Sequence, residues 1–114
     1  MEANRQELRQ LLLDVLEEAG ETAKLYYQSP ESVKLEYPCV IYKMGTFDSR
    51  YADNSPYKIV VRFDVTYITR SPTSKIPSLL VTKPGMAFDR YYVADNLHHY
   101  AYTYISNLKE DPND

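Results

Sequence analysis

The spacing of the apolar residues changes once along this chain, and that change limits the folds open to it. Between residues 5 and 19, apolar side chains recur at the i, i+3, i+4, i+7 spacing of a single helix face. They are Leu8, Leu11, Leu12, Val15, Leu16 and Ala19. After Gly20 the period becomes two, which is typical of β-strands. One N-terminal helix followed by strands predicts an α+β fold.

Residue types at both ends of this segment support a helix over residues 5–19. Asn4 is followed three positions later by Glu7, which resembles a capping box, in which two side chains bond to backbone N–H groups of the first turn. Gly20 follows the last apolar residue, where helices commonly end on a residue with left-handed backbone angles. The sequence therefore predicts an amphipathic helix with defined ends.

Two segments in the middle of the chain alternate apolar and polar residues in the manner of strands. Residues 25–44 are rich in Tyr, Val and Ile, but Pro38 interrupts them and marks a sheet edge, a bulge or a break between short strands. The stronger strand pattern begins at Cys39. Residues 58–70 show the clearest alternation, with one plainly apolar face and one mixed face, and predict a strand.

The second half of the chain predicts one more hairpin and a short helix. Residues 86–92 and 97–106 are expected to pair across a turn at residues 95–96. Residues 74–82 have room for a helical turn or two between proline-containing turns. Residues 45–56 carry enough Gly, Asp, Ser, Asn and Pro to predict a loop of about ten residues.

Together these segments predict a single domain over residues 1–114. In it the N-terminal amphipathic helix packs on a mostly antiparallel sheet of four to five strands, accompanied by a short second helix. A chain of 114 residues suits one domain with one core. Residues 109–114 contain one proline and three acidic residues, and we predict that they form a flexible C-terminal segment.

The tripeptide Ala-Asp-Asn occurs twice, at residues 52–54 and 94–96. Asp and Asn bond to nearby backbone groups and tolerate left-handed angles, so this pair is first of all a turn former. The second copy is interpreted as the turn of the predicted hairpin. The first copy lies in the predicted loop between Tyr51 and Tyr57, and loops of this length are often functional. We therefore predict that the first copy contacts a neighbouring subunit.

Tyrosine is unusually frequent, with twelve Tyr against three Phe and no Trp. Because a tyrosine ring is apolar while its hydroxyl needs a partner, such an excess suits half-buried sheet faces and interfaces. Tyr100, Tyr102 and Tyr104 share one face of the last predicted strand. This row either presents its rings to a protein partner or covers the N-terminal helix inside the domain, and the sequence leaves both open.

Charge and hydropathy indicate which partners to expect. The formal net charge of −3 argues against a general nucleic-acid-binding protein, which needs a basic surface. Apolar runs are far shorter than the roughly 20 residues needed to cross a bilayer, and the N-terminal residues lack the apolar core of a signal peptide. We expect a protein kept in a cytoplasm, or released from one without secretion, with no membrane partner.

Candidate catalytic groups are sparse. Cys39 with His98 or His99 would form a nominal thiol site, but Cys39 lies in an apolar strand, where buried and inert thiols are commoner. The two histidines are adjacent, so on a strand they point to opposite faces and cannot share one ion. No glycine-rich phosphate loop or metal-ligand spacing is present. We therefore predict no enzyme, no cofactor and no metal.

Four segments of the chain carry a distinctive order of motifs. They are residues 27–42 (YQSPESVKLEYPCVIY), 51–57 (YADNSPY), 70–77 (RSPTSKIP) and 88–99 (FDRYYVADNLHH). This succession resembles small proteins of tailed bacteriophages, of the tail-terminator or tail-completion kind, and the resemblance covers most of residues 8–105. It implies a compact α+β subunit that assembles as a six-fold ring. Such a ring caps the finished tail tube and offers its other face to head-completion proteins.

We therefore predict a virion structural protein whose hexameric ring terminates the tail tube and joins it to the neck and head. Its partners are further copies of itself, the tail tube protein and a head-completion or connector protein, and it reaches the virion after assembly in the host cytoplasm. The alternatives are a head–tail connector or head-completion subunit and, from another class, a small cytoplasmic enzyme using Cys39, His98 or His99. The predicted interface residues are Tyr51, Asp53, Asn54, Tyr57, Arg90, Tyr100, Tyr102 and Tyr104.

Overall fold

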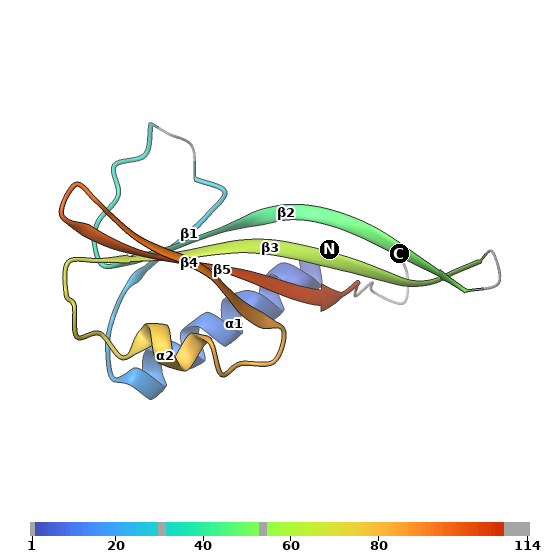
Figure 1. Ribbon diagram of the computed structural model, residues 1–114, viewed down its shortest axis with the longest axis horizontal. Coiled ribbons are helices and arrows are strands. Elements are labelled where there is room, and N and C mark those ends of the chain that lie inside the picture. The colour runs from blue at the N-terminus through green and yellow to red at the C-terminus, as the bar shows by residue number, and fades with distance from the viewer. Residues whose placement is uncertain (1, 30–31, 53–54, 109–114) are drawn as a thin grey trace.

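The computed structural model describes residues 2–29, 32–52 and 55–108, and for residues 47–52 and 55–58 it describes the backbone alone (Figure 1). Its elements, in chain order, are α1 (Glu2–Ala19), β1 (Lys24–Tyr27), β2 (Cys39–Ala52), β3 (Ser55–Thr69), α2 (Ile76–Leu80), β4 (Met86–Ala94) and β5 (Leu97–Asn107). The five strands form one sheet in the order β1-β2-β3-β5-β4. β1 pairs in parallel with β2, whereas the other neighbouring pairs are antiparallel. The predicted α+β fold, with its N-terminal helix, mostly antiparallel sheet and short second helix, is confirmed.

Helix α1 buries the predicted apolar face but begins earlier than residue 5. The capping-box prediction is wrong, because Asn4 lies inside the helix and is fully buried. Its side-chain amide donates to Ser106 Oγ at 3.0 Å and to the carbonyl of Asn107 at 2.8 Å, so it joins the helix to β5. At the other end Gly20 has the expected positive φ of 69°, and its N–H donates to the Glu17 carbonyl.

The main core lies between the helices and one face of the sheet. Alternate residues of β3 supply its centre, as the clearest strand pattern predicted: Val61, Phe63, Val65 and Tyr67 are all buried. On the other face a smaller cluster of Cys39, Ile68 and Leu97 is buried. The sheet is therefore covered by helices on one face and carries only a local apolar cluster on the other.

The loop predicted at residues 45–56 is wrong, because β2 and β3 continue through it as one long hairpin. Their register runs from Cys39 opposite Ile68 to Ala52 opposite Ser55. Gly45 sits at a register shift between Met44 and Thr46, and a Cβ on it would lie 3.0 Å from Asp64 Oδ2. The turn-forming residues of this segment thus include the glycine of a β-bulge, which bends the ladder without ending it.

The predicted hairpin in the second half of the chain is confirmed. β4 and β5 pair up to Ala94 opposite Leu97, and Asp95 and Asn96 connect them with φ values of 55° and 63°. Positive φ at both central residues is the geometry of a type I′ turn, whose twist matches that of the flanking strands. The second Ala-Asp-Asn copy therefore has the turn function that the sequence predicted.

Candidate assembly surfaces

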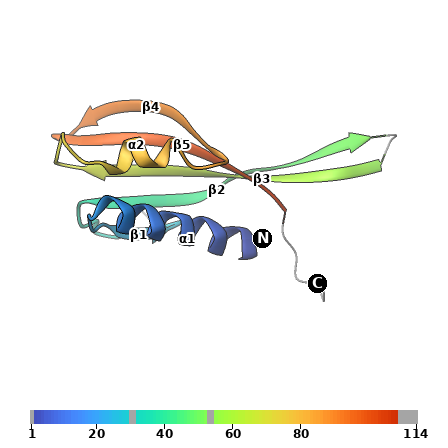
Figure 2. The same cartoon turned by 90° about the horizontal axis from the view of Figure 1, so that it is seen from below.

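Beyond the body of the sheet, β2 and β3 continue as a ribbon of two strands. The pairing of β3 with β5 stops at Val60 opposite Asn107, and that of β2 with β1 stops at Tyr42. We name residues 49–52 and 55–58 the hairpin arm, because their strands pair only with each other in the described part of the chain. Four strand residues span about 13 Å. Figures 1 and 2 show this arm extending away from both helices.

The arm is a candidate contact surface because it lacks a third strand. A two-stranded hairpin on its own is at best marginally stable in water, and its outer edges present unpaired backbone N–H and C=O groups. Two predicted interface residues, Tyr51 and Tyr57, belong to the arm by their backbone. Asp53 and Asn54 lie outside the described residues, as does the predicted flexible segment 109–114.

The second candidate surface is β4, which forms the outer edge of the sheet. Of the seven exposed large apolar side chains in the described part of the chain, four belong to this one strand. They are Phe88, Tyr91, Tyr92 and Val93, with exposed fractions between 41% and 55%. Such a concentration of exposed apolar side chains on an unpaired edge is typical of an interaction site.

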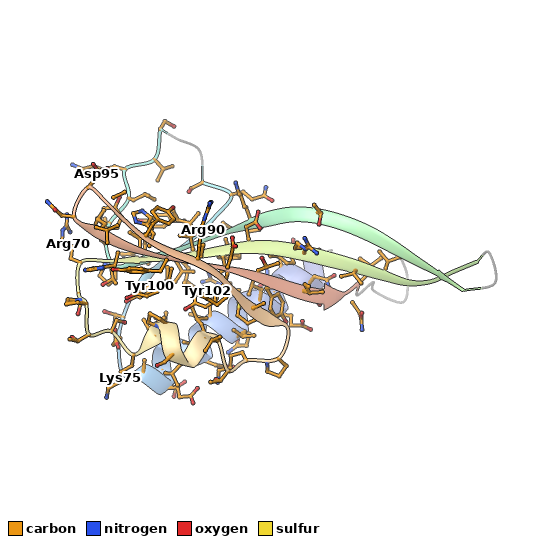
Figure 3. The ribbon with its side chains drawn as sticks, viewed as in Figure 1. Arg70, Lys75, Arg90, Asp95, Tyr100 and Tyr102 are labelled. Atoms are coloured by element: carbon orange, nitrogen blue, oxygen red, sulfur yellow. The ribbon has the colours of Figure 1, made fainter. Side chains whose placement is uncertain are left out.

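Arg90 lies on this exposed edge strand, where the sequence predicted an interface residue (Figure 3). Its guanidinium carbon lies 5.7 Å from the ring centroid of Tyr92, within the range of a cation–π contact. The Tyr92 ring in turn stacks on His99, with 4.6 Å between the ring centroids. These contacts support an ordered, mixed apolar and cationic surface along β4.

The predicted tyrosine row on β5 faces the helices, so two of its members are core residues. Tyr102 donates its hydroxyl proton to the carbonyl of Pro77 at 2.9 Å, and Tyr104 donates to Glu7 Oε1 at 2.5 Å. Burial raises the pKa of both hydroxyls well above the ordinary value, and the Glu7 carboxylate adds to this for Tyr104. We correct the predicted interface by removing Tyr102 and Tyr104 from it, because their rings are buried within the subunit.

Tyr100, the third member of the row, lies between the core and the exposed edge. Its ring centroid is 6.2 Å from that of Tyr67 and 4.9 Å from that of Tyr91. Burial also raises the pKa of the Tyr100 hydroxyl. Tyr100 is half-buried and lies beside the exposed Tyr91, its cross-strand partner, so its position is compatible with an indirect role at the β4 surface.

The described geometry does not bring Cys39 and the two histidines together. Cys39 is fully buried, and burial raises the pKa of its thiol to about 11. Cys39 pairs with Ile68, which pairs with His99, so two strand spacings, about 10 Å, separate Cys39 from His99. His98 points to the opposite face, as predicted, with Nδ1 2.7 Å from the Tyr91 hydroxyl. A thiol–imidazole pair requires hydrogen-bond reach, which this arrangement does not give.

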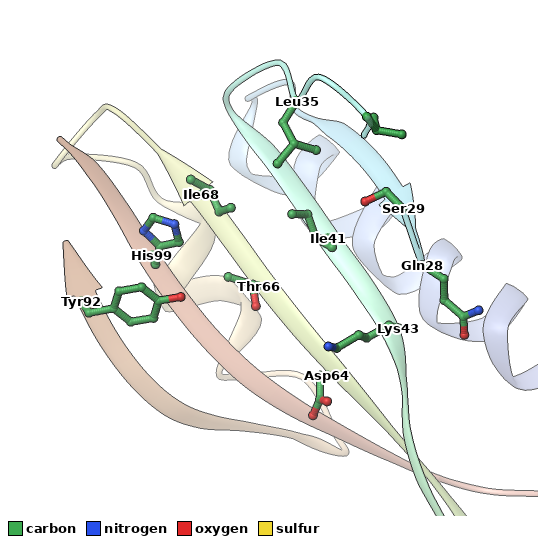
Figure 4. Close-up of a pocket in the computed structure, with 11 residues that line it drawn as sticks. Gln28, Ser29, Leu35, Ile41, Lys43, Asp64, Thr66, Ile68, Tyr92 and His99 are labelled. Carbon is green, nitrogen blue, oxygen red and sulfur yellow. The ribbon is translucent and has the colours of Figure 1, made fainter. Parts of the chain in front are cut away.

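A groove of about 400 Å³ lies on the face of the sheet opposite the helices (Figure 4). Lys43 and Asp64, directly opposite each other in the register, lie at one end, and Tyr92 and His99 line one side. Asp64 is four residues, about 13 Å, from the β3 residue that pairs with His99, so these two groups are not an acid–base pair. The sequence alone did not predict this groove, because Gln28, Val33 and Leu35 line it together with residues far along the chain, such as Tyr92 and His99.

Within residues 2–29, 32–52 and 55–108, no three His, Cys, Asp or Glu side chains are grouped so as to hold a metal ion. In the same residues, no helix is long and apolar enough to cross a membrane. Comparison of the chain with protein-family models and with curated proteins finds no match. Function is inferred from the arm and from the exposed edge of β4.

Proposed function

We propose that the protein is a structural subunit of a tailed-phage virion that forms a hexameric ring, terminates the tail tube and joins it to the neck. The order of motifs across residues 27–99 resembles the tail-terminator and tail-completion group. The observation that carries the proposal is structural. In the described residues, one chain presents unpaired strand edges at two separate places, along β4 and along the hairpin arm at the end of β2 and β3.

Two different edges on one chain favour a ring over a symmetric dimer. A head-to-tail contact uses unlike surfaces of successive subunits, and it generates a closed ring when the rotation between subunits closes. The arm extends beyond the other strands of the sheet (Figure 1). β4, by contrast, is fixed in the body of the sheet by its pairing with β5. A projecting surface and a fixed surface on the same subunit suit such a contact.

The charge of the chain agrees with a conduit for DNA. A net charge of −3 gives no general attraction to phosphates, so a ring of these subunits would not hold DNA as it passes through. Sequence-specific binding of nucleic acid is not part of the proposal. The partners are further copies of the chain, the tail tube protein, and the head-completion or connector protein on the other side.

The direct test is the mass of the purified protein, alone and mixed with tail tube protein. The expected species has six times the 13.3 kDa subunit mass and is bound to the end of the tube. The tube must be included because it can act as the template for the ring. A protein that stays monomeric in both conditions would refute the proposal.

A cryo-microscopy map of the particle gives the position of the ring. Contact with the last ring of tube subunits is expected for a terminator, whereas contact with the portal side would identify a connector or head-completion subunit. As a check on the enzymatic alternative, alanine at Cys39, His98 and His99 together should leave assembly intact. Loss of particles despite a folded subunit would favour that alternative.

A further inference from the structure

The free edge of β4 has the features of a strand-addition site. Ala94 and Leu97 flank a two-residue turn, so they form a hydrogen-bonded pair, and the antiparallel ladder then alternates. This alternation turns the backbone N–H and C=O groups of Tyr91 and Val93 away from β5. A bulge between Phe88 and Arg90 interrupts the first half of the strand. Residues 90–94 therefore form a regular edge able to accept another strand.

The opposite edge of the sheet, formed by β1, is less available for strand addition. β1 has only four residues, and the segment that follows it folds back, with the Glu36 N–H donating to the Tyr26 hydroxyl at 3.1 Å. Short strands and a covering segment are common ways to protect a sheet edge. β4, by contrast, has nine residues and exposes aromatic and aliphatic side chains on both faces.

The arm supplies a strand of suitable length. The outer edge of β2 is covered by β1 only at residues 39–42, and the Gln28 side chain accepts from the Met44 N–H at 3.4 Å. From residue 46 to residue 52 that edge has no neighbouring strand in the described part of the chain. The corresponding free part of β3 is only residues 55–58. β2 is therefore the better donor for a five-residue edge.

We propose that the outer edge of β2 over residues 46–52, which includes the β2 strand of the arm, adds to residues 90–94 of β4 in a neighbouring copy of the chain. This rests on the proposed function, because it names the contact from which the ring is built. Each subunit then donates one edge and accepts another, so every subunit in a closed ring has both edges paired. The contact also covers Tyr91, Tyr92 and Val93, whose exposure in the single subunit is otherwise unexplained.

Disulfide trapping in the full-length protein, assembled with tail tube protein, tests this pairing. Cysteine is placed at Ser49, Arg50 or Tyr51 in the arm and combined with Val93→Cys in β4. The natural Cys39 stays, because its thiol is buried and unreactive. Mild oxidation is expected to give a ladder of covalent oligomers up to the hexamer for at least one combination. The matched control combines the same arm cysteines with Lys24→Cys on the β1 edge, and no ladder is expected from it.

The outcomes separate this inference from the proposed function. If rings assemble on the tube but no arm–β4 combination is trapped, or if the β1 control is trapped equally well, the pairing is wrong and the ring proposal stands. If no ring forms even with the natural sequence, both fail. A ladder specific to the β4 combinations supports both.

Two substitutions at one exposed position give an independent measurement. Val93→Lys places a charge at the proposed contact, and Val93→Pro removes an outward N–H without taking a hydrogen bond from β5. Each is expected to raise the concentration needed for ring assembly at least about tenfold. The control is Val81→Lys, at an exposed position at the end of α2, which should leave the concentration needed for ring assembly unchanged. Equal assembly by folded Val93 variants and the Val81 control would overturn the pairing.

Discussion

In each of the two hairpins of this protein, the first strand ends on the alanine of an Ala-Asp-Asn sequence, but the strands that neighbour the two hairpins differ. Ala52 pairs with Ser55, and Ala94 pairs with Leu97, so each Ala-Asp-Asn copy lies at the end of a strand ladder. The β4–β5 hairpin lies against β3 along its whole body. In the described part of the chain, the last residues of the β2–β3 ladder have no such neighbour. The first tripeptide therefore begins where the arm's ladder ends, and the second where a ladder of the body ends.

Turn formation and availability for assembly depend on separate features of the chain. Asp95 and Asn96 favour the turn of the β4–β5 hairpin because they tolerate left-handed backbone angles, whereas Asp53 and Asn54 lie outside the described residues. The availability of each hairpin depends instead on where the neighbouring strands stop, which for β3 is at Val60 opposite Asn107. A mutation in the buried part of the body should therefore act on folding, and a mutation in the arm or on the exposed edge of β4 should act on assembly.

Removal of the arm is expected to have the largest effect on assembly and almost none on folding. Replacing residues 49–59 with Asn-Gly leaves Asp48 and Val60, which are paired in the register, on either side of a new two-residue turn. We expect ring formation with tube protein to be lost, while the free energy of unfolding changes by no more than about 1 kcal/mol, because in the described residues the arm's strands pair only with each other. Sedimentation and urea unfolding measure the two quantities. A shortened protein that still forms rings would show that the arm is not needed for assembly.

Gly85→Ala, just before β4, is expected to lower folding stability and to have almost no effect on assembly. Gly85 has φ of 85°, and an added Cβ would lie 2.6 Å from the carbonyl oxygen of Ile105. Strain at this φ together with the clash should lower the free energy of unfolding by about 3 kcal/mol. Gly20→Ala is the control, because φ is 69° there but the space is open, and it should cost only about 1 kcal/mol. Equal losses in thermal or urea unfolding would show that the contact with Ile105 is not decisive.

Alkaline pH should also act on the body and not on the arm. Burial raises the pKa of the Cys39 thiol from 9.0 to about 11, so the folded state keeps this proton more tightly than the unfolded state. The resulting stability is fully present below pH 9 and is lost as the pH rises to about 11, by roughly 2 to 3 kcal/mol. The raised pKa values of Tyr102 and Tyr104 extend this loss above pH 10.

Urea unfolding between pH 8 and pH 11 measures this loss. Cys39→Ala should remove most of the decline between pH 9 and pH 10, and the protein without its arm should show the same decline as the natural chain. If Cys39→Ala keeps the full slope in that interval, the buried thiol is not its source.

Local patterns predicted those parts of the fold that depend on neighbours in the sequence. The period of the apolar residues gave α1 and the buried face of β3, and the Asp95-Asn96 pair gave the hairpin turn. Asn4 was misinterpreted because its partners, Ser106 and Asn107, are about a hundred residues away. Partners so distant leave no periodic signal around the residue itself.

The arm was only partly predictable for a related reason. Turn-forming residues such as Gly45 indicated a loop, whereas the strands tolerate them through a bulge beside Asp64. That this region contacts a neighbouring subunit stays a prediction. The unpaired state of β4 was not foreseen, because sheet order is set by long-range pairing. Tyr102 and Tyr104 of the predicted β5 row are core residues. The sequence left their burial open, because the alternation of a strand does not reveal which of its faces the helices cover.

The smallest effect, and the most direct comparison, is expected from the same double substitution in the two Ala-Asp-Asn copies. Asp95→Ala with Asn96→Ala places two alanines at positive φ and should cost about 1 to 2 kcal/mol of folding stability without changing assembly per folded subunit. Asp53→Ala with Asn54→Ala is expected to weaken ring formation, because it alters the end of the arm. Urea unfolding and mass measurement with tube protein are made on both variants. If the 53–54 variant changes only monomer stability and leaves ring formation untouched, its Asp-Asn pair is a turn former alone, and the arm contacts its neighbour through its strands.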